Sequence, residues 1–322
     1  MAKPLSDELA ATPTVKEVTA DKRRIRQLEA LLERQIETIE SLRQKRFKLP
    51  LGIKPSGRKP ATFVRVIVPD THGAHIDLGA ANAFLEDLKE LKPQETILLG
   101  DHLDCGGWLA QHHILGFVPE TDATFADDCD AANSLLDEVD RRLATGSRKW
   151  YFEGNHEHRI VKACIKQTCG NKRDTEFMLS LWGCKAVLNL KGRGYQFVRR
   201  DELQPGLKVR GAIKLGKCFF THGKRTGSQA SQRTLANFKA NVVHAHNHRM
   251  MMATAQSAED QTLGAWCFGC LCKMQPLYYD TDPTDWSHGY GVQFVEPDGS
   301  FTTWPIPIID GKSRLRMLLG RK

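Results

Sequence analysis

The sequence lacks any long uninterrupted run of apolar residues. Of its 322 residues 41% are hydrophobic, but no stretch approaches the ~18 apolar residues that a transmembrane helix needs. The N-terminal MAKPLSDELAATPT is polar and acidic and has no apolar centre of the kind found in secretory signals. We therefore expect neither a membrane span nor a secretory signal, and the length suffices for one sizeable globular domain with an appendage.

The cysteines lack the pattern of a disulfide scaffold. There are nine, an odd number spread over a long chain, which favours reduced thiols and a cytoplasmic location. Cys267, Cys270 and Cys272 have a zinc-like spacing, but no second pair follows at a finger-like distance. Their segment, GAWCFGCLC, is apolar, and we interpret it as a buried strand rather than a metal site.

Acidic residues are absent between positions 43 and 60. The formal charge is +8, of which residues 1–60 carry +6 (14 Lys/Arg, 8 Asp/Glu) and the remaining chain +2. Three prolines and two glycines make the stretch a linker. Such a linker predicts contact with nucleic-acid phosphates. The alternative is a solvated segment that only increases solubility. The single aromatic residue, Phe47, does not form a platform on which bases could stack. Its seven basic residues are Arg43, Lys45, Arg46, Lys48, Lys54, Arg58 and Lys59.

The N-terminal region divides at about residue 20. Residues 1–20 are polar and contain two prolines, which predicts disorder, and residues 21–60 form a helical arm followed by the basic linker. Apolar residues recur in the arm at spacings of three and four, with one polar break. The pattern fits a short coiled coil that forms a homo-oligomer, or a single amphipathic helix lying on the chain's own body. The repeating positions are Ile25, Leu28, Leu32, Gln35, Ile39 and Leu42.

Polar side chains follow an apolar run in the stretch VRVIVPDTHGAHID. The run ends in Asp70 and His72, and its short, β-rich character predicts a buried strand. Ligands of open α/β sheets bind beyond the carboxyl ends of the strands. An Asp and a His at that position suit a metal site, although such a pair alone more often marks an Asp-initiated turn with an unrelated His.

The same design recurs four times along the chain. Further apolar runs end in Gly-Asp-His-Leu-Asp, in Gly-Asn-His-Glu, in a single His, and in His-Asn-His, where an extended strand would place both imidazoles on one face. His244 shares that face, and we interpret it as a buried structural residue. The polar residues delivered in this way are Asp101, Asp104, Asn155, His156, His222, His246 and His248.

The order Asp-x-His, Gly-Asp-x-x-Asp, Gly-Asn-His-Glu, His, His-x-His, spread over about residues 63–250, resembles the calcineurin-like metallophosphoesterase family. One departure is Ala245, where the family usually has Gly before the last His-x-His. The resemblance implies an α/β fold, a four-layer αββα sandwich of two mixed sheets flanked by helices. We expect this domain over residues 61–310, with a basic tail at 311–322.

The resemblance also implies a centre of two divalent metal ions. Asp70, His72 and His248 would bind the first ion, Asn155, His222 and His246 the second, and Asp101 would bridge the two. These ligand types suit manganese, our first choice, or Fe, Zn, Ni or Co better than Ca. Two such ions bind phosphate oxygens and activate a bridging water molecule for attack on phosphorus.

Four further residues receive roles around that centre. His156 matches the family's catalytic histidine, which stabilises the transition state or protonates the leaving group. We expect Asp104 to pair with His156 and fix its tautomer. Arg159 and Lys224 closely follow two of the motifs and are candidates for contact with the substrate phosphate, although each could equally be a surface cation.

The sequence therefore predicts a metal-dependent phosphoester hydrolase. All the expected metal-site residues are present, which favours an active enzyme. The basic arm favours a phosphodiesterase or nuclease acting on DNA or RNA. One alternative is a phosphomonoesterase acting on nucleotides, small molecules or phosphoproteins, with residues 105–120 forming a narrow pocket. The other is a nucleic-acid-binding or assembly module in which hydrolysis is minor.

Overall fold

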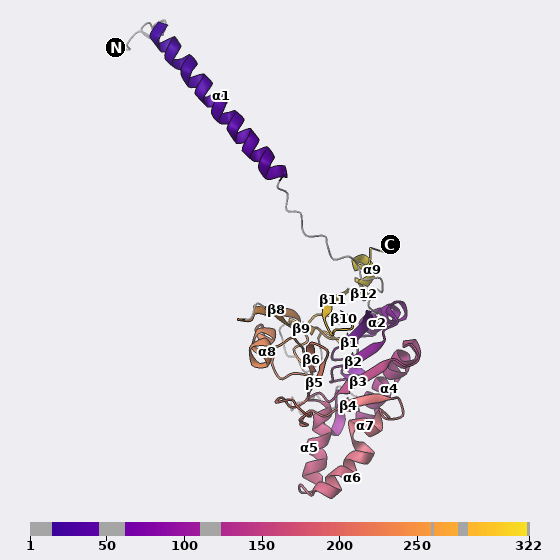
Figure 1. The fold of residues 1–322 in the computed structure, drawn as a ribbon. Helices are drawn as coiled ribbons and strands as arrows, with labels where there is room; N and C mark the ends of the chain where they lie inside the picture. The colour runs from indigo at the N-terminus through magenta and orange to yellow at the C-terminus, as the bar shows by residue number, and fades with distance from the viewer. Residues whose placement is uncertain (1–14, 45–61, 110–123, 259–260, 276–282, 321–322) are drawn as a thin grey trace, which may run out of the picture. The chain divides into compact units, whose positions relative to one another are not determined.

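The computed structural model describes residues 15–44, 62–109, 124–258, 261–275 and 283–320 (Figure 1). Two compact units divide the chain, Met1–Lys59 and Pro60–Lys322. Most of the basic linker and of the expected pocket loop at 105–120 lies outside the described residues. Among the described residues, no helix combines the length and the apolar character needed to cross a bilayer.

The first unit contains one long helix, α1 (Val15–Gln44). It begins earlier than predicted, because residues 15–20 continue the helix instead of being disordered. After Pro13 no helix-breaking residue interrupts the chain, so the helix extends upstream of the heptad pattern. Ile25, Leu28 and Leu32 are each more than half exposed, and the apolar stripe is therefore present on the helix surface.

The second unit contains two β-sheets and the helices that cover them. The first sheet is mixed: β1 to β4 pair in parallel, and β10 pairs antiparallel to β1. Its strands, in spatial order, are β12 (Lys312–Ser313), β11 (Phe301–Ile309), β10 (Gly289–Val295), β1 (Phe63–Val68), β2 (Glu95–Leu98), β3 (Arg148–Phe152) and β4 (Tyr195–Val198).

The second sheet is also mixed, because β6, β7 and β9 run parallel whereas the two outer strands are antiparallel. Its strands, in spatial order, are β5 (Ala212–Leu215), β6 (Cys218–Thr221), β7 (Val242–Val243), β9 (Thr262–Phe268) and β8 (Met250–Gln256). The helical elements are η1 (Gly73–His75), α2 (Leu78–Leu91), η2 (Gly107–Leu109), α4 (Phe125–Arg142), α5 (Glu157–Gln167), α6 (Lys172–Trp182), α7 (Cys184–Val187), α8 (Ala230–Phe238) and α9 (Leu315–Leu318).

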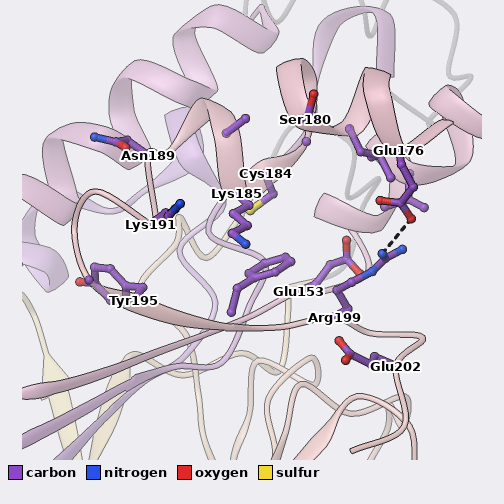
Figure 2. A pocket seen from close by; sticks show the side chains of 16 residues that line it. Glu153, Glu176, Ser180, Cys184, Lys185, Asn189, Lys191, Tyr195, Arg199 and Glu202 are labelled. Carbon is purple, nitrogen blue, oxygen red and sulfur yellow. Dashed lines mark hydrogen bonds and ion pairs between the residues drawn. The ribbon is translucent and has the colours of Figure 1, made fainter. Parts of the chain in front are cut away.

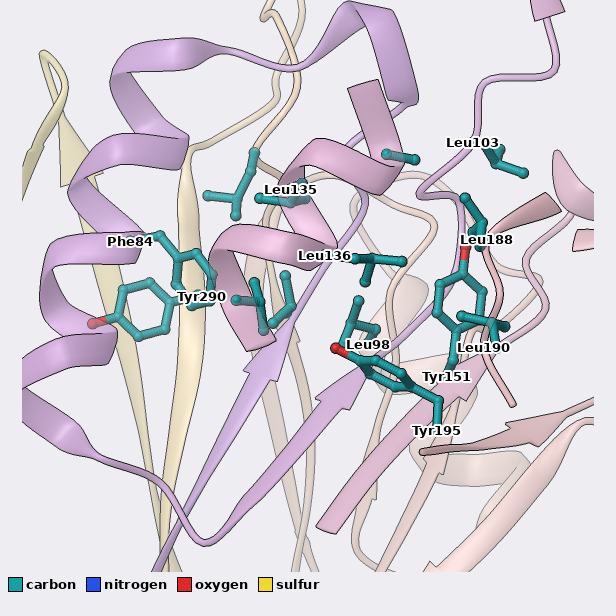
Figure 3. Packing of buried hydrophobic residues seen from close by; sticks show 14 of the residues in the cluster. Phe84, Leu98, Leu103, Leu135, Leu136, Tyr151, Leu188, Leu190, Tyr195 and Tyr290 are labelled. Carbon is teal, nitrogen blue, oxygen red and sulfur yellow. The ribbon is translucent and has the colours of Figure 1, made fainter. Parts of the chain in front are cut away.

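Three buried clusters separate four layers. The largest packs side chains of α2 and α4 against the first sheet, as Figure 3 shows for Phe84, Leu135 and Tyr151. A second cluster fills the space between the sheets, and a third lies between α8 and the second sheet. α2 and α4 thus cover the outer face of one sheet and α8 that of the other (Figure 1). The predicted αββα sandwich is confirmed.

The alternation along β1 shows how the sequence builds these layers. Val66 and Val68 belong to the cluster under the helices, whereas Ile67 belongs to the cluster between the sheets. Successive side chains of a strand point to opposite faces, and both faces of β1 are buried. A strand in this position needs apolar residues throughout, which is why its sequence is a continuous β-branched run.

Two boundaries differ from the predictions. The segment GAWCFGCLC is buried, but β9 ends at Phe268, because Gly269 adopts a φ of +85° that a regular strand does not permit. The tail after residue 310 is not peripheral throughout. Leu315 is fully buried in the largest cluster and Leu319 packs against it, so these two apolar residues, four positions apart on the tail, extend the domain.

Candidate metal centre

Five loops that follow strands carry the predicted site residues. The loops after β1, β2 and β3 leave the first sheet, and those after β6 and β7 leave the second. Parallel strands send their carboxyl ends to one edge of a sheet. All seven predicted ligands lie in these loops: Asp70, His72, Asp101, Asn155, His222, His246 and His248.

The first group consists of Asp70, His72 and His248. His248 Nε2 lies 2.9 Å from Asp70 Oδ2 and 3.1 Å from His72 Nε2. All three side chains are buried. Residues 178 positions apart therefore direct three donor atoms of metal-ligand type to one point.

The second group consists of Asp101, Asn155, His222 and His246. His222 Nε2 lies 2.9 Å from Asn155 Oδ1 and 3.2 Å from Asp101 Oδ2. The ligand atoms of Asp101, His222 and His246 lie within 4.8 Å of one another. The structure thus brings together the four side chains that the sequence predicts for the second ion and the bridge.

Asp101 lies between the two groups. Its carboxylate is within 4.8 Å of ligand atoms of Asp70 and His72, and also of those of His222 and His246. The backbone N–H of His156 donates to Asp101 Oδ1 at 2.8 Å, which fixes the carboxylate. This position is the one that a bridging ligand requires.

The donor chemistry of both groups fits divalent cations. His222 Nδ1 donates to the Leu99 carbonyl at 2.9 Å, which leaves Nε2 directed at the oxygens of Asn155 and Asp101. His72 Nδ1 donates to Asp104 Oδ1 at 2.8 Å, so its Nε2 lone pair faces His248. Metal-bound histidines typically have such partners on their other nitrogen.

The pKa values report the same crowding of charge. Burial alone would raise the pKa of Asp70, but the adjacent His248 more than offsets this and holds it well below its usual range. Burial alone would lower the pKa of His248, but the Asp70 carboxylate outweighs burial and raises this pKa to about 9. Burial lowers the pKa of His246 to about 4, which keeps this imidazole neutral and free to coordinate.

Four of the predicted ligands have a left-handed backbone. The φ angles are +54° at His72, +53° at Asp101, +69° at His246 and +55° at His248. Such angles are uncommon outside glycine, and they concentrate where a site over-determines the backbone. The premise that His246 and His248 share one face of an extended strand is wrong, because β7 ends at Val243 and the two imidazoles reach different groups.

Asp104 contacts both imidazoles with which it could pair. Its Oδ1 lies 2.8 Å from His72 Nδ1 and 3.1 Å from His156 Nδ1. His156 Nδ1 also donates to the Asp104 carbonyl at 2.8 Å. The expected pairing with His156 is thus present in the geometry, and the contact with the ligand His72 is an addition that the sequence did not suggest.

The two predicted substrate contacts differ in position. Arg159 is buried, and its guanidinium lies 3.1 Å from His156 Nε2 and 3.0 Å from the Asp104 carbonyl. It therefore places a positive charge at the edge of the centre. Lys224 is exposed in the loop after His222, and the described residues give it no hydrogen bond or ion pair.

Sequence reasoning missed Glu157. This fully buried carboxylate accepts hydrogen bonds from the backbone N–H groups of Asp101, His102 and Leu103, and from Tyr151 Oη at 2.9 Å. Burial, reinforced by Asp101, raises its pKa to about 7. Glu157 thereby holds the loop that carries Asp101, the predicted bridging ligand, and its place directly after Gly-Asn-His was the available signal.

Two glycines allow the loops after β2 and β3 to approach each other. A Cβ on Gly154 would overlap Asp101 Oδ1, and one on Gly100 would lie 2.6 Å from the Gly154 backbone nitrogen. Gly100 also has a φ of +98°. The contact between the two loops therefore requires the absence of a side chain at both positions.

Two other histidines have structural roles. His244 is buried, with Nε2 2.9 Å from Ser231 Oγ, and burial lowers its pKa to about 4. His102 is buried with Nδ1 3.0 Å from Thr71 Oγ1. His244 thus lies among structural contacts, as predicted for it.

A cavity of about 840 Å³ lies apart from these ligands (Figure 2). It is lined by α6, α7 and β4, and an ion pair of 3.3 Å joins Arg199 Nη1 to Glu176 Oε1 at one side. None of the seven predicted ligands lines it. Glu153 lines the cavity and lies two residues before Asn155 in the chain, so the cavity and the centre share the loop after β3.

No protein-family model and no curated protein sequence matches this chain. Solved structures with a similar arrangement include Vps29 from Entamoeba histolytica, at 12% identity over 78% of this chain and 95% of that chain, with a TM-score of 0.36. The phosphoesterase YfcE from E. coli has 16% identity over 75% of this chain and 98% of that chain, with a TM-score of 0.33. The nuclease MPE from Pseudomonas putida has 12% identity, 74% and 87% coverage and a TM-score of 0.29.

These identities and TM-scores are low, and the similarity concerns the fold alone. The four-layer arrangement implied by the sequence resemblance to calcineurin-like metallophosphoesterases is present in the chain. What the centre does is argued below from its own residues.

Proposed function

We propose that this protein is a metal-dependent hydrolase of phosphate esters. The observation that supports the proposal most directly is the position of Asp101, whose carboxylate lies within 4.8 Å of ligand atoms on both sides. A shared carboxylate between two groups of imidazole and oxygen donors is the arrangement that two-metal hydrolysis needs. When bound, the ions would neutralise phosphate oxygens and lower the pKa of a water molecule.

The protein's own residues would orient the reaction. His156 Nδ1 is engaged by the Asp104 carbonyl, so Nε2, which lies 3.1 Å from the Arg159 guanidinium, is the nitrogen that remains for a substrate. Burial lowers the His156 pKa, but the Asp101 and Asp104 carboxylates outweigh this and raise it. A protonated His156 can donate a proton to the leaving alkoxide. Arg159, beside Nε2, would donate hydrogen bonds to a phosphate oxygen there.

The first test is hydrolysis by metal-loaded protein, beginning with Mn²⁺, of a diester reporter and a monoester reporter. His156→Ala should lower turnover by about 10²–10⁴-fold, the usual contribution of a general acid. His158→Ala is the matched control, because His158 is a half-buried neighbour whose Nδ1 contacts Glu153 instead of Asp104. Equal activity in wild type and His156→Ala, with two ions bound, would contradict the assignment.

We further propose a diester of DNA or RNA as the substrate. Support comes from the charge distribution, because residues 1–60 carry +6 whereas the rest of the chain carries +2. The basic residues of this segment would bind a phosphate backbone and release its counterions. Cleavage of single-stranded DNA should then fall steeply with salt, and removal of residues 1–59 should flatten that dependence.

The same assays separate the alternatives. Cleavage of the monoester alone, unaffected by removal of residues 1–59, would indicate a phosphomonoesterase acting on nucleotides, small molecules or phosphoproteins. Salt-sensitive DNA binding that persists without metal, combined with negligible turnover on all substrates, would indicate a binding module. Asp101→Asn should abolish turnover under either enzymatic assignment.

A further inference from the structure

The chain beyond β9 lies along the loop that carries Asp70. Leu271 N–H donates to the Asp70 carbonyl at 2.8 Å, and Asp77 N–H donates to the Leu271 carbonyl at 2.9 Å. Bridges also link Asp70 to Cys270 and Ile76 to Cys272. The cysteine-rich segment is therefore the backbone neighbour of the first predicted metal-ligand loop.

The side chains of this segment alternate. Leu271 belongs to the large apolar cluster under the helices. Cys270 and Cys272, one position to either side, are buried at 0% and 2% exposure but belong to none of the three apolar clusters. Extended residues two apart point to the same side, so both thiols face away from the apolar cluster that holds Leu271.

One of the two thiols reaches the first group of ligands. The Sγ of Cys272 and the nitrogens of His72 and His248 lie within 4.8 Å of one another. An ion bound tetrahedrally to both atoms would hold sulfur and nitrogen about 3.6 Å apart, a separation that lies within this bound. One buried thiol and two imidazoles therefore form a mixed sulfur and nitrogen donor set. The sequence resemblance did not include the sulfur.

We propose that Cys272 is a ligand of the first metal ion, together with Asp70, His72 and His248. This inference rests on the proposed dinuclear function and refines it. A coordinated thiol is deprotonated, so the first position gains a soft, negatively charged donor. Thiolate ligands favour Zn²⁺, Fe²⁺ or Co²⁺ over Mn²⁺, and the first position should therefore select one of these ions.

Cobalt provides a direct readout of sulfur coordination. Metal-free full-length protein is titrated with Co²⁺, and absorbance in the near ultraviolet is followed for a sulfur-to-cobalt charge-transfer band. We expect the band to grow with the first equivalents of Co²⁺. Cys169→Ser serves as the background for every sample, because Cys169 is the exposed thiol among the nine cysteines.

Two variants identify the sulfur. Cys272→Ser should lose the band, whereas Cys270→Ser, which removes the neighbouring buried thiol, should keep it. Competition in the same samples should show that Cys272→Ser weakens Zn²⁺ binding by about 10-fold or more while leaving Mn²⁺ binding nearly unchanged. The wild-type spectrum tests the inference even where a variant does not fold.

The outcomes distinguish this inference from the function on which it rests. Cobalt binding without a charge-transfer band, in protein that hydrolyses phosphate esters, would overturn the role of Cys272 and leave the proposed function intact. A band that survives Cys272→Ser would also overturn it. Failure of the wild type to bind two ions of any kind would contradict both.

Discussion

At the scale of single residues, Asp104 connects the predicted metal ligands to the predicted catalytic histidine. One of its oxygens is within hydrogen-bond distance of His72 Nδ1 and His156 Nδ1. Burial alone would raise the pKa of Asp104. The hydrogen bonds and charges of the two imidazoles outweigh burial and hold this pKa far below its usual range. The carboxylate therefore stays charged and sets the tautomer of both rings.

Asp104→Asn should weaken metal binding and turnover together. The amide keeps the shape of the carboxylate but loses its charge, so neither Nδ1–H keeps an anionic acceptor. We expect a loss of about 10–100-fold in metal affinity, measured by calorimetric titration. Asp130→Asn, an exposed carboxylate on α4, should change nothing. Unaltered affinity in Asp104→Asn would show that Asp104 does not orient His72.

Gly154→Ala should displace the predicted bridging ligand Asp101, because the loop after β3 has no room for a Cβ at this position. The added methyl group would overlap Asp101 Oδ1, and either the carboxylate or the loop must move. We expect loss of turnover larger than about 10²-fold, with folding checked by circular dichroism. Gly79→Ala is the control, because Gly79 lies in α2, where alanine favours the helix. Normal activity of Gly154→Ala would rule out the tight loop contact.

The sequence predicted these residues unevenly. Asp70, Asn155 and His222 stand within three residues of the end of an apolar run, so the pattern located them. Glu157 was missed because its function is to accept N–H groups from a loop more than fifty positions away, which no local pattern reveals. Cys272 was missed because an apolar surrounding indicates a strand, and only the turn at Gly269 directs the segment to the centre.

At the scale of elements, α4 supports the centre from outside the sheet. Asp128, fully buried near the start of the helix, accepts from Ala74 N–H at 3.1 Å and from Gly106 N–H at 2.8 Å. These amides belong to the loops after β1 and β2. One side chain of α4 therefore fixes two of the loops that carry predicted ligands.

Asp128→Ala should lower the free energy of unfolding. It leaves two part-buried amide groups without this acceptor, and a fully buried unsatisfied group costs about 1–3 kcal/mol, so each should cost less than that. Urea denaturation measures the change. Asp130→Ala, on the exposed side of the same helix, should stay within about 0.5 kcal/mol of wild type. If both variants unfold alike, the two loops do not depend on α4.

The contact between α2 and β10 should depend on pH. Tyr290 Oη donates to Asp87 Oδ2 at 2.7 Å, and burial raises the Asp87 pKa. The folded chain therefore holds this proton to higher pH than the unfolded chain. The stabilising contribution is complete at low pH and is lost as the pH rises from the unfolded pKa through the raised folded value.

Asp87→Asn isolates that effect. The difference in unfolding free energy, wild type minus variant, should decrease as the pH rises above the unfolded pKa of about 4, by about 1.4 kcal/mol for each unit of pKa shift. Urea denaturation at each pH gives the values. A difference that is constant or that rises with pH would contradict the raised pKa.

Helix boundaries were predictable where local chemistry sets them. α2 begins after Asp77, whose side chain accepts from Ala80 N–H at 2.8 Å, and it ends before Pro93, which cannot continue the helix. β7 is different. Only Val242 and Val243 are strand, although the apolar run continues to Ala245, because the following residues turn with left-handed φ angles toward the centre. At this position the backbone conformation that brings His246 and His248 to the centre, and not the apolar pattern, sets the end of the strand.

At the scale of the whole molecule, the centre joins the two sheets. Asp70, His72, Asp101 and Asn155 come from loops of the first sheet, and His222, His246 and His248 from loops of the second. Bound ions would therefore link the two halves of the sandwich, in addition to the apolar cluster between them.

Metal removal should lower the thermal stability of the whole domain. At a free metal concentration of 100 times Kd, binding to the folded state alone adds about 2.7 kcal/mol. Differential scanning fluorimetry with and without a chelator should show a lower Tm in the chelated sample. Asp101→Asn, which lacks the shared carboxylate, should show a smaller difference. A Tm that does not respond to chelation of the wild type would contradict a link between the sheets.

The distance along the chain between Asp70 and His248 has a consequence for folding. These partners are 178 residues apart, and contacts of high sequence separation form late, after the loop between them has been closed. During synthesis, a chain that has emerged only through the first parallel strands holds Asp70, Asp101 and Asn155 but none of the histidines from the second sheet. The nascent chain would therefore stay inactive toward phosphate esters until both sheets have formed, and the appearance of turnover would mark the completion of folding.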